Sequence, residues 1–130
     1  MVFSSIWGKM KATEGLKKNE DFQKVYKAGR SKSDRAYVLY VLPNGLEVNR
    51  LGVSVSKKVG NSVVRHRIKR LVKEACRLND ARFHKGFDLV VIARGAASSA
   101  GYRDTERSIL KLACSLHAAE ESGNDAEAVH

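Results

Sequence analysis

Residues 51–93, LGVSVSKKVGNSVVRHRIKRLVKEACRLNDARFHKGFDLVVIA, contain the stretch that decides the fold. At its start, residues 51–56 alternate apolar and polar side chains, the pattern of a strand with one buried face. At its end, residues 87–93 are almost continuously apolar, as in the interior of a sheet. Between them, residues 61–79 have helical periodicity, and the whole stretch has the length of a βαβ crossover. We therefore expect an α/β fold.

Three further segments flank this unit. Residues 18–28 are predicted to form a short helix, residues 36–42 a strand and residues 102–118 a long helix. The short link between the strands at 36–42 and 51–56 favours an antiparallel pair. The predicted architecture is an α/β (α+β) two-layer sandwich with the order α-β-β-α-β-α.

The charge of the chain is strongly positive and unevenly distributed. There are 24 Lys and Arg residues against 14 Asp and Glu residues, a formal net charge of +10 over 130 residues. Residues 119–130 contain acids but no Lys or Arg, and we expect an acidic disordered tail there. Residues 1–15 have no sustained periodicity and are predicted to be a flexible arm. This leaves residues 16–118 as a single domain.

A domain with so much positive charge usually keeps it because it binds a polyanion. Nucleic acid, an anionic membrane surface and simple solubility are the alternatives at this point. No apolar run approaches the ~20 residues of a membrane span, so we do not expect a membrane-spanning protein. The length argues against a multidomain enzyme, and two cysteines argue against a disulfide scaffold.

The helix predicted for residues 61–79 has two opposite faces. Its apolar residues share one arc of a helical wheel: Val64, Ile68, Leu71, Val72, Ala75 and Leu78. The residues on the opposite side are basic: His66, Lys69, Arg70, Lys73 and Arg77. Arg65 and Arg67 flank the apolar arc, and Lys57 and Lys58 precede the helix. Solubility faces usually mix both signs of charge, whereas a single acid opposes this run, so polyanion binding is favoured over a solvated face.

Aromatic residues form the second pattern. Phe22 and Tyr26 share one face of the first predicted helix, and Tyr40 or Tyr37 lies on the following strand. Aromatic rings beside a basic surface hold unpaired nucleotides, because bases stack on the rings while Lys and Arg follow the phosphates. Taken singly, however, an aromatic residue in such a position belongs more often to the core than to a binding surface.

Residues typical of catalytic sites are sparse. The four histidines are scattered, and the sequence has no HExxH, Walker, GxSxG or Cys/His zinc motif. A two-metal nuclease needs clustered carboxylates, and no such cluster is recognisable. We therefore predict no catalytic residue and no metal site in the protein itself. Cys76 and Cys114 are expected to be small buried or half-buried side chains in a reducing compartment, with Cys114 facing the core.

The basic string SVSKKVGNSVVRHRIKRLVKEACR, residues 54–77, resembles that of the bacterial ribonuclease P protein family. This family provides the small protein partner of the ribozyme that removes the 5′ leader from precursor tRNA. Residues 16–29, 36–42 and 85–94 also resemble the first helix, first strand and third strand of the family. The resemblance covers roughly residues 16–117. It implies a left-handed βαβ crossover, although parallel strands usually have right-handed connections.

The resemblance also implies roles for individual residues. Those implied to bind RNA, on the basic helix and the loop before it, are Lys57, Lys58, Asn61, Arg65, His66, Arg67, Lys69, Arg70 and Lys73. Those implied to line a cleft for the leader are Phe22, Tyr26 and Tyr40. His66 replaces the Asn that is usual in the family, and an imidazole cannot offer the paired donor and acceptor of an amide.

The implied function is that of the protein subunit of ribonuclease P. Such a subunit binds ribonuclease P RNA and precursor tRNA and promotes endonucleolytic removal of the leader. The chemistry belongs to the RNA, which requires Mg²⁺, and not to a metal site of the protein. The implied location is the cytoplasm, with no membrane partner and no protein oligomer expected. The residues alone also allow a general structured-RNA-binding domain, ribosome-associated or chaperone-like, an unaided protein nuclease or a DNA-binding module.

Overall fold

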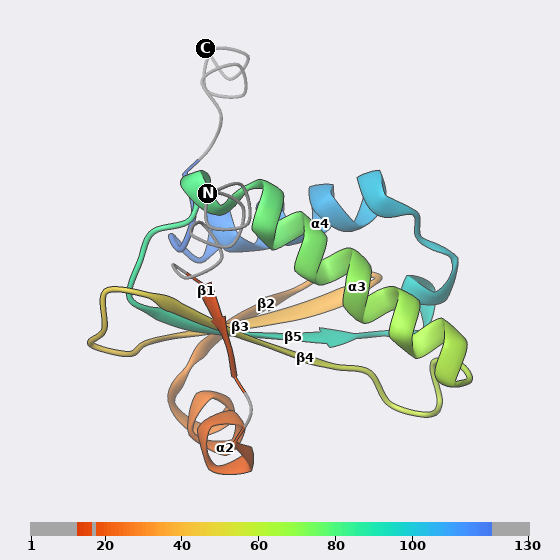
Figure 1. Cartoon of the computed structure of the whole chain (residues 1–130), viewed down its shortest axis with the longest axis horizontal. Helices are drawn as coiled ribbons and strands as arrows, with labels where there is room; N and C mark the ends of the chain where they lie inside the picture. The colour runs from red at the N-terminus through yellow and green to blue at the C-terminus, as the bar shows by residue number, and fades with distance from the viewer. Residues whose placement is uncertain (1–12, 17, 121–130) are drawn as a thin grey trace, which may run out of the picture.

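A computed structural model describes residues 13–16 and 18–120, which form a mixed α+β domain (Figure 1). The strands are β1 (Thr13–Gly15), β2 (Arg30–Ser33), β3 (Tyr37–Pro43), β4 (Asn49–Ser54) and β5 (Phe87–Ala93). The helices are α2 (Asn19–Ala28), α3 (Ser62–Leu78) and α4 (Tyr102–Ser115), with short 3₁₀ helices η1 (Asp80–Arg82) and η2 (Gly95–Ser99). The predicted order α-β-β-α-β-α is confirmed for the main elements, to which the structure adds β1 and β2.

The five strands form one sheet in the order β1-β4-β5-β3-β2. Its central strand β5 is antiparallel to β3 and parallel to β4. β3 and β4 are therefore not neighbours, and the antiparallel pair predicted for residues 36–42 and 51–56 is wrong. The reason lies in the apolar sequence of β5, which needs cover on both faces and is buried best in the middle of a sheet. β4, α3 and β5 form the expected parallel crossover, for which the family resemblance implies a left-handed connection.

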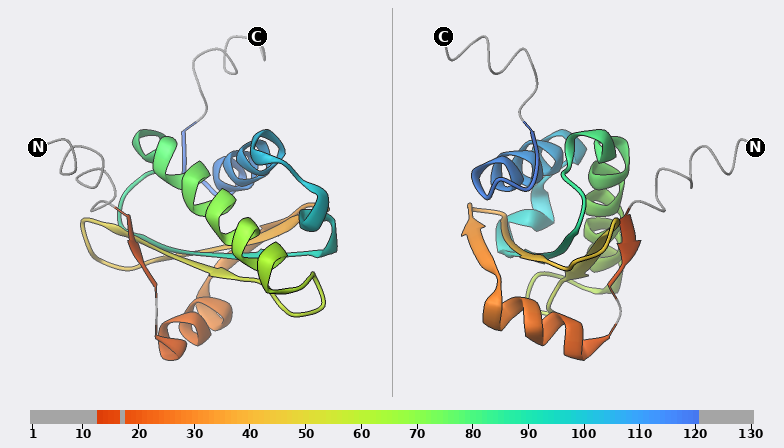
Figure 2. Two further views of the ribbon diagram at one scale, coloured as in Figure 1. Left: turned by 45° about the vertical axis from the view of Figure 1, so that its right-hand side comes forward. Right: turned by 90° about the vertical axis from the view of Figure 1, so that its left-hand side faces the viewer.

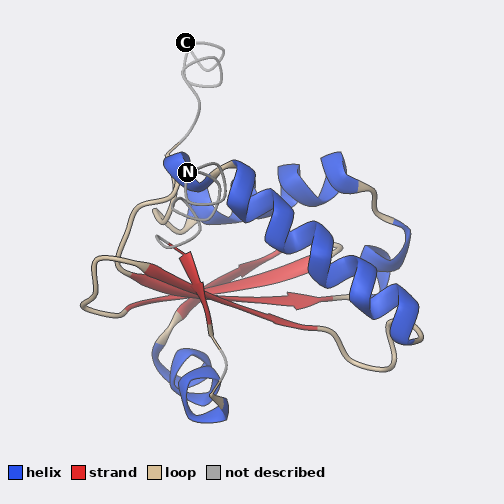
Figure 3. Cartoon of the chain, viewed as in Figure 1, coloured by secondary structure: helices blue, strands red, loops and turns tan. Residues whose placement is uncertain are grey.

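Helices cover both faces of the sheet, as the two views in Figure 2 show. α3 and α4 lie on one face, over the main hydrophobic core. Residues of that core include Leu39, Leu89 and Val91 from the strands and Ile68, Val72 and Ile109 from the helices. α2 lies on the opposite face, over a smaller cluster of Leu16, Val25 and Val90. The predicted two-layer sandwich thus describes the sheet with α3 and α4, and α2 adds a partial third layer (Figure 3).

α3 is the longest helix and begins where the sequence predicts. The side chain of Asn61 accepts a hydrogen bond from the Val64 amide at 3.0 Å, which caps the helix. The buried residues of α3 are Ile68, Val72, Ala75 and Cys76. Leu78, predicted to face the core, is 57% exposed. Leu78 lies at one edge of the apolar arc of the helical wheel. Cys76 lies just outside the opposite edge and is buried.

Two short edge strands were not expected from the sequence. β1 pairs in parallel with β4, so Thr13–Gly15 belong to the sheet and not to the predicted arm of residues 1–15. Residues 1–12 of that arm lie outside the described residues. β2 pairs with β3, and all four of its residues are exposed. A strand without buried residues lacks the apolar alternation from which strands are predicted.

The domain continues slightly beyond residue 118. α4 ends at Ser115, and His117 then adopts a positive φ of 60°, which a right-handed helix does not contain. Ala119 is buried and forms a β-bridge with Phe83. Residues 119 and 120 of the predicted acidic tail are therefore described as part of the domain, and residues 121–130 lie outside the described residues. Across residues 13–16 and 18–120, no helix is long and apolar enough to cross a membrane.

Candidate nucleic-acid interface

The outer face of α3 carries cations that no described acid neutralises. Arg70 and Lys73 are exposed, and neither forms an ion pair with any residue that the structure describes. The one acid of α3, Glu74, is held by the fork of Arg77, with N···O distances of 2.7 and 2.8 Å. The hydrogen bond from Arg77 lowers the pKa of the Glu74 carboxyl. Because Glu74 is paired with Arg77, Arg70 and Lys73 remain available to phosphate groups.

His66 and Lys69 complete this face. His66 is exposed, and Lys69 is half-buried. We call His66, Lys69, Arg70 and Lys73 the cationic face of α3. All four were predicted to lie on one side of the helix, and the structure brings them together there.

The loop between β4 and α3 leads into the cationic face. Lys57 and Lys58 are exposed in this loop. Arg65 Nε donates to the carbonyl oxygen of Gly60 at 3.2 Å, which ties the end of the loop to the first turn of α3. Asn61 is exposed and uses its side-chain oxygen to cap the helix, so its position is set by α3 itself.

Arg67 lies in a different environment from the other predicted RNA-binding residues. Its Nη2 donates to the carbonyl oxygen of Ala100 at 2.9 Å, just after η2. Its Nη1 is buried and has no hydrogen-bond partner among the described residues. Part of the guanidinium is therefore used inside the domain, which the position of Arg67 on the wheel did not indicate.

The three aromatic residues predicted to form a cleft lie together on the α2 face of the sheet. The ring centroids of Phe22 and Tyr26 are 6.4 Å apart, and those of Tyr26 and Tyr40 are 5.2 Å apart in an edge-to-face arrangement. All three side chains are half-buried, so each keeps some surface for a ligand. Tyr37, the other candidate on β3, points to the opposite face. It is fully buried there, and its hydroxyl is hydrogen-bonded to Thr105 at 2.9 Å.

β4 lies beside these rings on the same face. Gly52 lies directly under Phe22, and a Cβ built on Gly52 would overlap the ring. Burial raises the pKa of the Tyr26 hydroxyl, and a side-chain hydrogen bond with Ser54 opposes this effect. We call Phe22, Tyr26, Tyr40, Gly52 and Ser54 the aromatic surface. Gly52 and Ser54 were not predicted as part of this site, although the alternation of β4 places both on the face opposite Val53.

The aromatic surface and the cationic face lie on opposite sides of the sheet, since α2 and α3 cover different faces (Figure 2). β4 connects them along the chain. Ser54 belongs to the aromatic surface, Lys57 and Lys58 follow in the next loop, and α3 begins at Ser62. The rings and the basic residues of the loop are therefore joined by a short stretch of chain at the end of β4.

A third group of cations extends the positive surface. Arg103, Arg107 and Lys111 are exposed on α4, which packs beside α3 on the same face of the sheet. Of these three residues, Arg107 alone pairs with an acid within the described part of the chain, Asp104 at 3.4 Å. These three residues were not predicted as part of the interface, although their spacing of four residues is that of one helix face.

The described residues provide little for catalysis. No group of three or more His, Cys, Asp or Glu side chains within them could hold a metal ion. Cys76 is fully buried, and burial raises the pKa of its thiol to about 12, so it is an inert core residue. Cys114 is half-buried and packs against the main core, as predicted for a core-facing side chain. The arrangement of charges and rings is that of a binding protein.

A basic α/β domain with a cationic helix on one face of its sheet and clustered, half-exposed rings on the other belongs to the RNA-binding proteins. The chain belongs to the ribonuclease P protein family, whose sequence profile matches residues 10–117. It is 47% identical over 103 residues to the ribonuclease P protein component of Alkaliphilus oremlandii (strain OhILAs). That match spans 79% of this chain and 90% of the relative.

Solved structures agree with this assignment. The ribonuclease P protein of Staphylococcus aureus superposes with a TM-score of 0.73 at 35% identity, covering 82% of this chain and 97% of that one. The protein from Thermotoga maritima gives a TM-score of 0.70 at 32% identity, with 75% and 93% covered. The chain is therefore a member of a family of tRNA-processing subunits, each part of an endoribonuclease holoenzyme.

Proposed function

We propose that this protein binds the catalytic RNA of ribonuclease P and the 5′ leader of precursor tRNA, and thereby promotes endonucleolytic removal of the leader. The observation that carries the proposal is the aromatic surface. Phe22, Tyr26 and Tyr40 come from two elements and meet, half-exposed, beside the strand that leads to Lys57 and Lys58. Single-stranded RNA needs this combination of stacking rings and adjacent cations.

The cationic face and its loop serve structured RNA in this proposal. Each Lys or Arg that neutralises a phosphate releases a condensed counterion, so RNA binding becomes tighter at low salt. Arg70 and Lys73 suit this role because no acid pairs with them in the described part of the chain. Neutralising phosphates where two RNAs meet also reduces their mutual repulsion, and less Mg²⁺ is then needed for activity.

Leader binding gives the protein a means to distinguish substrate from product. Mature tRNA lacks the leader and so loses every contact with the aromatic surface, while its other contacts remain. The preference for precursor over mature tRNA is the difference between two binding free energies, and in this proposal the leader contacts supply that difference. Base stacking on an aromatic side chain contributes about 1–3 kcal/mol per base.

The RNA subunit carries the chemistry in this proposal. Mg²⁺ bound by that RNA would activate water and stabilise the leaving oxygen. The described residues of the protein do not provide a cluster of side chains that fits the ion. Lys57, Arg70 and Lys73 instead hold RNA phosphates and leave the metal to the RNA. The cytoplasm is the proposed place of action, because both RNA partners are found there.

Cleavage of a 5′-extended precursor tRNA at low Mg²⁺ tests the proposal. The reaction is run with the protein alone, with a bacterial ribonuclease P RNA alone and with both together. Accurate cleavage only in the mixture supports a protein subunit. Cleavage by the protein alone refutes the assignment of the chemistry to RNA. Tight RNA binding without stimulation supports instead a general structured-RNA-binding domain.

A further inference from the structure

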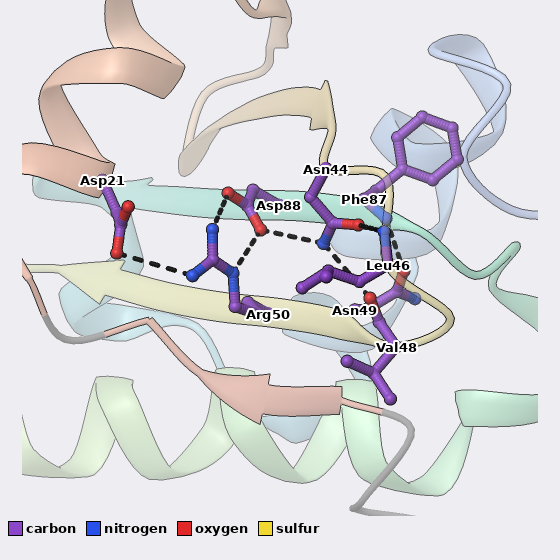
Figure 4. Close-up of polar contacts among 8 residues, drawn as sticks. All are labelled: Asp21, Asn44, Leu46, Val48, Asn49, Arg50, Phe87 and Asp88. Carbon is purple, nitrogen blue, oxygen red and sulfur yellow. Dashed lines mark hydrogen bonds and ion pairs between the residues drawn. The ribbon is translucent and has the colours of Figure 1, made fainter.

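Arg50 lies between two carboxylates on the α2 face of the sheet (Figure 4). On one side, its Nε and Nη2 donate to the two carboxylate oxygens of Asp88 on β5 at 2.8 and 2.7 Å. On the other side, its Nη1 lies 3.5 Å from Oδ2 of Asp21 on α2. The guanidinium thus connects the middle of the sheet to the first turn of a helix.

The contacts to the sheet fix the orientation of Arg50 independently of α2. Arg50 and Asp88 are cross-strand neighbours in the β4–β5 register, and the Asp88 side chain is only 3% exposed. Asn44 donates a further hydrogen bond to Asp88 at 3.0 Å and is itself held by the Val48 carbonyl at 3.1 Å. Because the planar guanidinium is held by two hydrogen bonds to one carboxylate, its remaining nitrogen, Nη1, faces Asp21 in a fixed position.

Near its start, α2 is attached to the sheet by the apolar packing of Phe22 and, just before the helix, by a hydrogen bond from the Leu16 amide to the Leu51 carbonyl oxygen at 2.8 Å. The helix has ten residues, and Val25, in its second half, is its only buried residue. Its N-cap residue, Lys18, makes no side-chain capping hydrogen bond. Among the described residues, the ion pair of Asp21 with Arg50 adds a charged side-chain contact between the first turn of α2 and the sheet.

The first turn of α2 positions Phe22, one of the rings of the aromatic surface. Phe22 follows Asp21 directly, and its ring lies on Gly52, two residues beyond Arg50 on β4. Tyr26, one turn later, reaches Tyr40 and Ser54. A shift of the first turn therefore moves Phe22 along or away from β4, and the spacing of the rings changes with it.

We propose that Arg50 is a positioning residue for leader binding: anchored on Asp88, it holds α2 through Asp21 so that Phe22 and Tyr26 stand at the spacing a single-stranded leader requires. The proposal rests on the function proposed above, in which the leader binds these rings. It assigns to Arg50 no contact with RNA. Its effect is expected in the preference for a leader and not in overall RNA affinity.

The decisive variant is Asp21→Asn, with Glu20→Gln as its matched control. Both substitutions remove one acid from the first turn of α2, so they change the net charge and the interaction with the helix dipole equally. Glu20 is exposed and pairs with no cation within residues 13–16 and 18–120. Asp21→Asn also leaves the Arg50–Asp88 pair intact, which a substitution of Arg50 does not.

Two measurements follow for each variant. The first is the dissociation constant of the protein–RNA holoenzyme for precursor tRNA with a leader and for mature tRNA. We expect Asp21→Asn to reduce the ratio of the mature-tRNA constant to the precursor constant by about 1.5- to 5-fold, the range for a partly exposed ion pair, and Glu20→Gln to leave it unchanged. The second is amide hydrogen exchange in the free protein, which should become faster in residues 19–28 of Asp21→Asn and stay the same in α3.

The outcomes separate this inference from the proposed function. If the wild type prefers leader-bearing RNA and Asp21→Asn shows the same preference and the same hydrogen exchange, the positioning role is overturned while the proposed function stands. An equal loss of affinity for both RNAs also overturns it, because that result indicates a general structural role. Equal affinity of the wild type for both RNAs refutes the leader site and, with it, this role of Arg50. Arg50→Lys gives an independent check. A lysine cannot hold both carboxylates, so it should reduce the ratio in the same direction.

Discussion

Gly52→Ala is the most direct perturbation of the aromatic surface, because it adds one methyl group beneath a ring. The new Cβ would lie 2.7 Å from Cε1 of Phe22, and closer still to Cζ, whereas carbon atoms pack at about 3.5–4.0 Å. The ring must therefore move by about 1 Å. Leu16 Cβ, at 3.3 Å from the new methyl group, leaves little room on that side.

The size of the effect follows from this geometry. Adding a methyl group to a packed site costs about 1–3 kcal/mol of unfolding free energy. Phe22 is half-buried and can turn toward solvent, so we expect a value near the lower end of that range. If a leader base stacks on Phe22, the displaced ring should also weaken precursor binding, by up to about 1–3 kcal/mol, and leave mature tRNA unaffected.

Two assays and one control check this reasoning. Urea denaturation gives the unfolding free energy, and paired titrations with precursor and mature tRNA give the leader-dependent part of the affinity. Gly95→Ala is the control, since nothing lies within 4 Å of a Cβ at Gly95. The reasoning is refuted if Gly52→Ala retains both the stability and the leader preference of the wild type.

Two further predictions concern the helical layer. Arg70→Ala combined with Lys73→Ala should reduce the slope of log K against log salt concentration for RNA binding by roughly 0.7–0.9 per lost phosphate contact. Lys32→Ala, on the exposed strand β2, is the control and should leave the slope unchanged. Equal slopes for the wild type and both variants would show that the cationic face does not contact RNA. Burial and its hydrogen bond to Glu106 raise the pKa of Tyr102 to about 12, so the folded state favours the protonated phenol. Its contribution to stability is then complete below pH 10 and lost as the pH rises toward 12, and unfolding curves of Tyr102→Phe should show a smaller loss over that interval.

Much of the local structure could be predicted from residue order. Residues 61–79 were predicted as the long helix, which spans Ser62–Leu78, and 87–93 as the strand that β5 occupies. Both predictions succeed because helical periodicity, an Asn cap and a continuous apolar run are properties of neighbouring residues. β1 and β2 escaped prediction because they are short and polar, and only their partners in the sheet make them strands.

Only part of the candidate site could be predicted, because sequence patterns report on neighbouring residues and not on contacts between distant segments. Arg70 and Lys73 could be placed on an exposed face from the wheel alone, since opposite arcs of a helix have opposite environments. Arg67 could not, because its partner at Ala100 lies 33 residues away in the chain. Asp21, Arg50 and Asp88 come from three elements, and no spacing within the sequence indicates that they meet.

The sequence by itself determined the basic, amphipathic character of α3, the apolar character of β5 and the presence of rings on α2 and β3. These properties depend on the identity and spacing of nearby residues. Only the tertiary structure decided that β5 separates β3 from β4, and that Tyr40 joins Phe22 and Tyr26 while Tyr37 is buried. Strand pairing and the choice of an open face depend on contacts between distant segments, and these form only when the whole sheet assembles and α2 is held against one side of it.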